Sequence, residues 1–463
     1  MNINCFPKVI RIGAGLSLLV ALLAFFVRAA EAQQPTVQPG GVTRLSLGDA
    51  ARMAAAQTAG VQSAEARVQE ARARVNQQKS SLLPQVEADP NWTSHTLNSA
   101  SFGFNFPAEP GKPPLLAPNG QIIGPVNLWD FRGQVSQTVF NPAARQRVVA
   151  ARSNVSSATA DVAAVAEDAA TNAAGIYVRA LRSDAALQAR LADSSLAADL
   201  LNVAHEQLQA GVGVALDVTR AQSQLATSRS QLIAARNDRD RARIDLVRAL
   251  NLPLDTRLDL TDSLGSVTFP EAATEAAAVD QAMRSRPDIR AADAQLAAAQ
   301  QQLEAIRATR LPTVGVFGND GPTGLGLNHL LNTYTYGVQL SWPVLEGGRR
   351  EGQQQEQQAV MRDIDVRRRD LRNQAAADVR SAMLDIASAR EQVDAARERQ
   401  RLAEQEVDQA RDRFRAGVSG NADVITASLT LNNARTSVID ALSSYQAARV
   451  SLARAEGTVS QIR

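Results

Sequence analysis

The stretch 333–344 reads Thr-Tyr-Thr-Tyr-Gly-Val-Gln-Leu-Ser-Trp-Pro-Val and alternates strictly between apolar and polar residues. Period-two alternation of this length, with aromatic residues at both ends, predicts a β-strand with an apolar outer face and a polar inner face. The side chains expected to face lipid are Tyr334, Tyr336, Val338, Leu340 and Trp342.

A second strand of the same kind is expected in the first half of the chain, where Trp129, Phe131, Val135 and Val139 alternate with polar residues. Weaker partner strands contain Val86, Ala88 and Trp92, and then Val314 and Val316. A soluble hairpin could explain either pair alone, but two similar pairs favour a transmembrane β-barrel. Four strands cannot close, because the smallest such barrels have about eight strands. Open edges are not tolerated in lipid, so three chains with twelve strands are expected, which predicts a homotrimer.

The rest of the chain is predicted to be helical and duplicated. Gln209-Ala210-Gly211-Val212 recurs as Arg415-Ala416-Gly417-Val418, each followed by an Asp-Val pair. Each half has a helix, a strand pair, a long helix and a return helix, at 46–81, 142–209 and 217–250, then at 274–309, 348–415 and 423–456. The long helices would measure about 100 Å. Helical periodicity alone also fits a plain coiled-coil rod, and the strands argue against that alternative.

Residues 1–32 have the features of a signal peptide. Lys8 and Arg11 precede an apolar run, and Ala30-Glu31-Ala32 resembles a cleavage site. The expected organisation is therefore a signal peptide at 1–32, a first repeat at 33–250, a linker at 251–273 and a second repeat at 274–463. Without the signal peptide the chain keeps 46 basic and 46 acidic residues, and this neutrality argues against nucleic acid as a partner.

No pattern of catalytic or cofactor-binding residues was found. The histidines His95, His205 and His329 lack the spacing of metal ligands, and the only cysteine, Cys5, leaves with the signal peptide. The glycines at 321, 324 and 326 are not followed by a long helix, so no dinucleotide-binding motif applies. We therefore expect no enzyme activity, no catalytic residue, no cofactor and no metal.

Three motifs in order carry a resemblance to a known family. They are Ser285-Arg286-Pro287-Asp288-Ile289, the turn from Pro343 to Arg349, and the paired Ala-Gly-Val…Asp-Val turns. With these motifs the mature chain resembles the TolC-like outer-membrane efflux proteins over essentially its whole length. The resemblance implies a β-barrel in the outer membrane of a Gram-negative bacterium, continued by an antiparallel α-helical barrel across the periplasm.

The resemblance also implies a function. Such a trimer is the passive exit duct of a tripartite efflux or type I secretion system, and it works with a periplasmic adaptor and an inner-membrane pump. The hairpin tips at Gly211, Val212, Gly213 and Gly417 would contact the adaptor, although these glycines could simply end helices. The alternative function is a trimeric coiled-coil surface adhesin, which would carry its anchor strands at the carboxyl end rather than internally.

Asp217 and Asp423 match acidic positions that line the narrowest part of the pore in the family. The alternative is that both are ordinary N-caps of the return helices. In the best-known pattern a tyrosine, an arginine and a second aspartate form a closing network, and here Phe414, Ser419 and Thr426 take those places. Constriction of the pore by the Phe414 ring is therefore an alternative to a polar lock.

Overall fold

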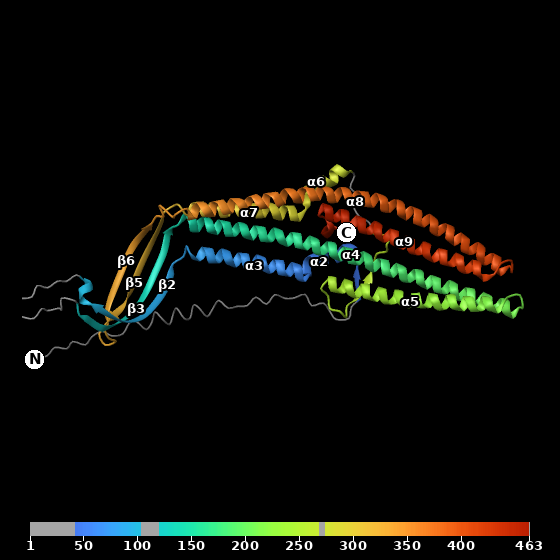
Figure 1. Ribbon diagram of the computed structural model, residues 1–463, viewed down its shortest axis with the longest axis horizontal. Coiled ribbons are helices and arrows are strands. Elements are labelled where there is room, and N and C mark those ends of the chain that lie inside the picture. Colours follow the sequence, from blue (N-terminus) through green and yellow to red (C-terminus); the bar gives the residue numbers. More distant parts are fainter. Residues whose placement is uncertain (1–41, 103–119, 268–273, 463) are drawn as a thin grey trace, which may run out of the picture. The chain divides into compact units, whose positions relative to one another are not determined.

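The computed structural model describes residues 42–102, 120–267 and 274–462, which all belong to one compact unit, Val42–Arg463. The predicted signal peptide and residues 268–273 of the predicted linker lie outside these ranges. Figure 1 shows a small sheet followed by long antiparallel helices.

The same order of elements occurs twice in the chain. The first set is α2 (Leu47–Gln57), α3 (Ala59–Ser80), β2 (Gln85–Asn98), β3 (Ile122–Phe140), α4 (Pro142–Gln209) and α5 (Ala215–Ala249). The second set is α6 (Glu275–Ser285), α7 (Pro287–Ala308), β5 (Thr313–Gly324), β6 (Leu331–Ser341), α8 (Arg349–Arg415) and α9 (Asn421–Glu456). Outside the two sets lie β1 (Val42–Leu45), β4 (Arg257–Leu260) and the short 3₁₀ helix η2 (Val459–Gln461). The expected mainly helical, duplicated fold is thus confirmed.

The first helix of each repeat differs from the prediction, because each is split into pieces of 11 and 22 residues. In the second repeat the break falls at Arg286, whose ψ of 121° is extended. Proline at 287 disfavours a helical conformation of the preceding residue and supplies no N–H group. In the first repeat Thr58, with ψ of 150°, makes the same break without a proline. The sequence around Thr58 contains no proline or glycine pattern that predicts a break between Gln57 and Ala59.

The long helices begin where their local sequence predicts. The side chain of Asn141 accepts a hydrogen bond of 2.8 Å from the Ala144 N–H group, and Pro142 occupies the first helical position, where its missing donor costs nothing. Helix α8 follows Gly348, whose φ of 83° requires a residue without a side chain. Among the residues that the structure describes, no helix combines the length and the apolar character needed to cross a membrane.

The helices form two rows that share α4 and α8. Near the sheet the neighbours are α3, α4, α7 and α8, in that order, and beyond the middle of the long helices they are α5, α4, α9 and α8. The short helices therefore lie end to end along the long ones, as Figure 1 shows. Many of the buried positions on α4 and α9 are alanines, which lets the helix backbones approach closely.

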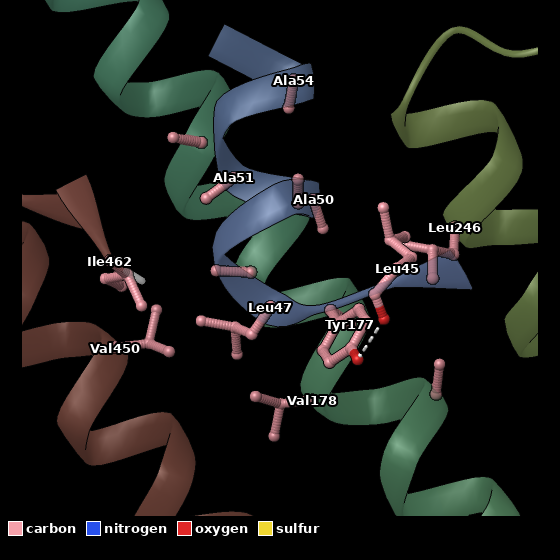
Figure 2. Close-up of a cluster of buried hydrophobic side chains, with 14 of the residues drawn as sticks. Leu45, Leu47, Ala50, Ala51, Ala54, Tyr177, Val178, Leu246, Val450 and Ile462 are labelled. Atoms are coloured by element: carbon pink, nitrogen blue, oxygen red, sulfur yellow. Dashed lines mark hydrogen bonds between the residues drawn. The ribbon is translucent and has the colours of Figure 1, made fainter. Parts of the chain in front are cut away.

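The main hydrophobic core lies at the middle of α4, where the start of the described chain docks (Figure 2). Strand β1 pairs in parallel with β4, and Leu45, Leu47 and Tyr177 are each no more than 1% exposed. The Tyr177 hydroxyl lies 2.8 Å from the Leu45 carbonyl oxygen and 3.0 Å from Asp262 Oδ2. These two acceptors share its single proton.

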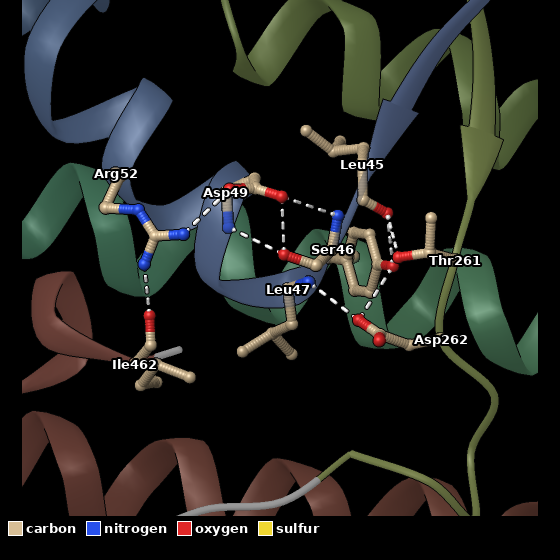
Figure 3. Close-up of polar contacts among 9 residues, drawn as sticks. Leu45, Ser46, Leu47, Asp49, Arg52, Thr261, Asp262 and Ile462 are labelled. Atoms are coloured by element: carbon tan, nitrogen blue, oxygen red, sulfur yellow. Dashed lines mark hydrogen bonds and ion pairs between the residues drawn. The ribbon is translucent and has the colours of Figure 1, made fainter.

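The surrounding polar contacts join the end of β1 and the start of α2 to α4 and to the residues after β4 (Figure 3). Asp262 Oδ2 accepts a 2.8 Å hydrogen bond from the Leu47 N–H group, and the Thr261 N–H group donates to the Leu45 carbonyl oxygen. Burial, followed by the nearby Asp262 carboxylate, raises the pKa of the Tyr177 phenol above its ordinary value. The phenol therefore stays protonated and able to donate.

We predict that Tyr177→Phe lowers the free energy of unfolding by about 1–3 kcal/mol, because it leaves the buried Leu45 carbonyl and Asp262 carboxylate with one donor fewer. The measurement is thermal unfolding of the purified protein in detergent. Tyr445→Phe removes the same hydroxyl from a partly exposed ring and is the matched control. Equal losses of stability in both variants would contradict this role for the Tyr177 hydroxyl.

Candidate functional site

The four longer strands form one antiparallel sheet in the order β2-β3-β5-β6. Pairing of β3 with β5 joins the two repeats, so the two predicted strand pairs make one continuous surface. Within the described residues, the outer edges of β2 and β6 have no partner strand.

The register brings most of the apolar residues of the four strands to one side of this sheet, where Gln137 and Asp320 are polar exceptions. Val86 pairs with Val135, Val135 with Gly318, and Gly318 with Tyr336, and directly paired residues share a face. The Trp92 and Trp129 ring centroids lie 5.9 Å apart, and those of Tyr334 and Tyr336 lie 6.1 Å apart. We call this side the apolar face; it contains Val86, Ala88, Trp92, Trp129, Phe131, Val135, Val314, Val316, Tyr334, Tyr336, Val338 and Leu340.

The opposite side of the sheet is mainly polar. It carries Gln85, Glu87, Asp89, Asn91, Asp130, Arg132, Gln134, Ser136, Thr335 and Gln339. Arg132 Nε donates a 2.7 Å hydrogen bond to Asp130 Oδ1 on this side. Its apolar exceptions include Leu128, Phe317 and Leu331. The Phe317 ring covers Gly337, where an added Cβ would lie 2.9 Å from the ring.

Two residues of the predicted apolar alternation, Trp342 and Val139, lie outside the regular pairing of the strands. Strand β6 ends at Ser341, so Trp342 is one residue beyond it; its indole N–H donates to the Arg310 carbonyl oxygen at 3.2 Å. Val139 falls where the β3–β5 register shifts between Thr138 and Phe140. A β-bulge of this kind leaves its extra residue unpaired.

The hairpin tips between α4 and α5 and between α8 and α9 share one turn geometry. Gly211 and Gly417 have φ values of 74° and 70°, in the left-handed region. The Val212 N–H group donates to the Gln207 carbonyl, and the Val418 N–H group donates to the Arg413 carbonyl. This pattern is a Schellman helix end, so both glycines terminate helices. At Gly213 an added Cβ would lie 2.9 Å from the Gln207 Cβ, which explains the third glycine of the first tip.

The N-cap interpretation of the two tip aspartates is wrong. The N-cap residues are Val214 and Gly420, and Asp217 and Asp423 lie inside the first turns of α5 and α9. There a carboxylate is favoured by the positive end of the helix rather than by capping geometry. The two positions also differ. The Asp217 side chain is 13% exposed and lies 3.7 Å from Arg220 Nη1, whereas Asp423 is exposed.

A ring that constricts the pore would have to be exposed, and the Phe414 ring is buried. It is 3% exposed and packs against Leu200, Ala204, Val218, Ala221 and Val424, which come from α4, α5 and α9. The ring thus serves as the core of the tip, because its partners from the other helices cover it. Of the remaining predicted positions, Ser419 is partly exposed, and Thr426 is exposed with its hydroxyl donating to the Ala422 carbonyl oxygen at 2.9 Å.

Two side-chain amides that the sequence analysis missed join the two hairpins at this level. Gln207 Nε2 donates to the Phe414 carbonyl oxygen at 2.8 Å, from the first repeat to the second. Asn421 Nδ2, from a residue with no exposed surface, donates to the Asp217 carbonyl oxygen at 2.7 Å, in the opposite direction. We call these two bonds the amide latch. Gln207 lies inside α4 and Asn421 begins α9, and no local sequence pattern at either position predicts a contact between the two repeats.

A buried ionic network joins the same hairpins farther from the tip. The Asp193 side chain on α4 is 1% exposed, and Arg190 Nη1 and Arg435 Nη1 lie 3.1 Å and 2.9 Å from its two oxygens. Arg190 Nη2 also donates to the Thr436 hydroxyl at 3.3 Å. Because a buried charge without partners is strongly unfavourable, this network fixes the register of α4 against α9.

Comparison with known proteins agrees with this architecture. A probable efflux pump outer membrane protein, SepC of Pseudomonas putida, is 31% identical over 193 residues, which are 40% of this chain and 39% of that protein. The chain thus matches about two fifths of the length of that relative. The outer membrane channel CmeC of Campylobacter jejuni gives a TM-score of 0.69 at 16% identity over 89% of this chain and 85% of that chain.

The outer membrane protein VceC of Vibrio cholerae gives a TM-score of 0.68 at 19% identity, over 89% of this chain and 96% of that chain. These similar proteins are outer-membrane proteins rather than enzymes, and none supports the adhesin alternative. The family model described as outer membrane efflux protein matches residues 50–252 and 278–458. The chain therefore belongs to the outer membrane efflux protein family.

Proposed function

We propose that three copies of this chain form the outer-membrane exit duct of a tripartite efflux or secretion system. The observation that best supports this proposal is the sheet, which has one mainly apolar face, one mainly polar face and two unpaired edges. Hydrocarbon offers no hydrogen-bond partners to such edges. Pairing β6 of one copy with β2 of the next would satisfy them, and a closed ring would turn the polar face towards a water-filled interior.

The helices support the same closure. Helix α5 packs mainly on α4, and α8 packs on α6, α7 and α9, so each helix also has a surface turned away from its own chain. Exposed apolar side chains lie on both helices. They include Ile233 and Ile244 on α5, at 66% and 54%, and Leu384 and Leu402 on α8, at 72% and 51%. Contact between α5 of one copy and α8 of the next would bury these side chains.

The tips are the proposed docking site for a periplasmic adaptor. Val212 and Val418, directly after the two helix-terminating glycines, are 76% and 71% exposed, and Val214 and Leu216 are also exposed. Apolar side chains on rigid turns are suited to packing against another protein. An inner-membrane pump would supply energy, because the duct itself has no catalytic step.

The exposed Asp423 and the less exposed Asp217 are proposed to line the narrow end of the duct. Three-fold symmetry would place six carboxylates there, and a ring of carboxylates favours cations. In planar bilayers we expect the duct to select cations over anions, because the carboxylates place negative charge around the narrow end. The double change Asp217→Asn with Asp423→Asn should reduce this selectivity, and Asp423→Asn alone should account for most of the effect.

The matched control for this recording is Asp238→Asn with Asp255→Asn, which removes the same charge at exposed positions away from the tips. Loss of the charge–dipole interaction in the first turn of a helix costs only about 0.3–1 kcal/mol, so assembly should survive both changes. Wild-type selectivity in the tip variant, or equal loss in the control, would refute pore lining by these aspartates.

The amide latch is proposed to hold the two hairpins of one chain together in the closed duct. Each amide–carbonyl hydrogen bond contributes about 0.5–1.5 kcal/mol, so both together favour the joined state by roughly 5- to 150-fold. The double change Gln207→Ala with Asn421→Ala should therefore raise the open probability in single-channel recordings. Because neither bond involves a charged side chain, salt should change this difference little.

Gln392→Ala is the matched control for the latch, because within the described residues the Gln392 amide donates to Ser388 on the same helix and not to another hairpin. Its open probability should equal that of the unchanged protein. If the latch variant opens no more often than this control, the two bonds have no part in closure.

A further inference from the structure

A polar cavity lies where the sheet meets the helices. It has a volume of about 640 Å³ and is lined by Gln146 of α4, Glu304, Arg307, Arg310 and Leu311 at the end of α7, and Gln354 of α8. This volume lies within the range of sites that hold small molecules, about 300–1,000 Å³. None of the proposed tip or pore residues lines it.

The cavity carries one cation without a protein partner. Arg307 Nη1 lies 2.6 Å from Glu304 Oε1, so these two charges neutralise each other. The Arg310 side chain is exposed, and within the described part of the chain its guanidinium makes no hydrogen bond or ion pair. The site therefore presents one net positive charge with the fork of donors that suits a phosphate group.

Arg310 is also joined to the apolar face. The Trp342 indole N–H donates to the Arg310 carbonyl oxygen, and the Trp342 ring is 64% exposed. Leu340 continues the apolar face above it, and Val344 beyond it is 75% exposed. Tryptophan and arginine side by side at the end of an apolar surface are typical of the level where lipid headgroups begin.

Neighbouring copies would leave this cavity accessible. Helix α7 lies between α4 and α8 of the same chain, whereas closure of the helical barrel would use the outer sides of α3, α5 and α8. The fold alone does not require the arginine either. Helices α3 and α7 have the same length, and the position after α3 that corresponds to Arg310 is occupied by Leu82.

We propose that this cavity binds the headgroup phosphate of a phospholipid in the periplasmic leaflet, with Arg310 as the phosphate ligand and Trp342 beside the acyl chains. The proposal rests on the membrane orientation given under the proposed function. A headgroup without a compensating positive charge, such as phosphatidylglycerol, should bind better than phosphatidylcholine, because the choline cation would offset the attraction to Arg310.

The test is native mass spectrometry of the purified mature protein in detergent with either phosphatidylglycerol or phosphatidylcholine added. We expect preferential retention of phosphatidylglycerol, and Arg310→Gln should lower its occupancy roughly threefold or more. Trp342→Phe, which keeps an aromatic ring but loses the indole donor, should lower it less. Arg229→Gln on α5, an exposed arginine far along the chain, is the control and should change nothing.

Three results would overturn the proposal. Equal loss of lipid in the Arg310 and Arg229 variants would show attraction by surface charge in general. Arg310-dependent binding of inorganic phosphate that displaces the lipid would show a site for the free ion instead. Conductance of the same preparation in planar bilayers distinguishes failure of the lipid site from failure of the proposed function. A conducting protein without Arg310-dependent lipid binding refutes only the lipid site. A protein that never inserts into the bilayer refutes the proposed function.

Discussion

The architecture depends on one constraint, which is that a sheet in contact with hydrocarbon must pair every backbone N–H and C=O group. The four strands of this chain present a continuous apolar face, yet the outer edges of β2 and β6 are unpaired in the described residues. A single chain cannot meet this constraint with four strands. The proposed assembly of identical copies would do so, and it would also join the exposed apolar sides of α5 and α8.

The ends of the long helices bear on a second requirement of the proposed duct, which would have to close and still be able to open. At the tips the hairpins meet through the Phe414 core and the uncharged amide latch, whereas farther along α4 a buried network around Asp193 joins them. Buried charges resist separation strongly, since each needs its partners. Under the proposed function, the stronger ionic contact at Asp193 and the weaker amide contact at Gln207 would let the hairpins separate only at their ends.

The sequence alone predicted much of this fold, because periodic patterns are local. Helix α4 runs from Pro142 to Gln209 as expected, and the alternation around Tyr336 identifies the strand and its two faces. The break at Thr58, the burial of Phe414 and the amide latch were missed. Gln207 and Phe414 are 207 positions apart, so their contact depends on how the two repeats pack and not on either segment. The capping interpretation of Asp217 and Asp423 failed because each helix begins slightly earlier than expected.

The most direct test of the account is the mass of the mature protein extracted from outer membranes in mild detergent, measured by native mass spectrometry before heating. Closure of four-stranded sheets into one barrel predicts three copies in each particle and single chains only after denaturation. A population of stable, freely soluble single chains would contradict the account, because the unpaired edges of β2 and β6 would then persist without a partner.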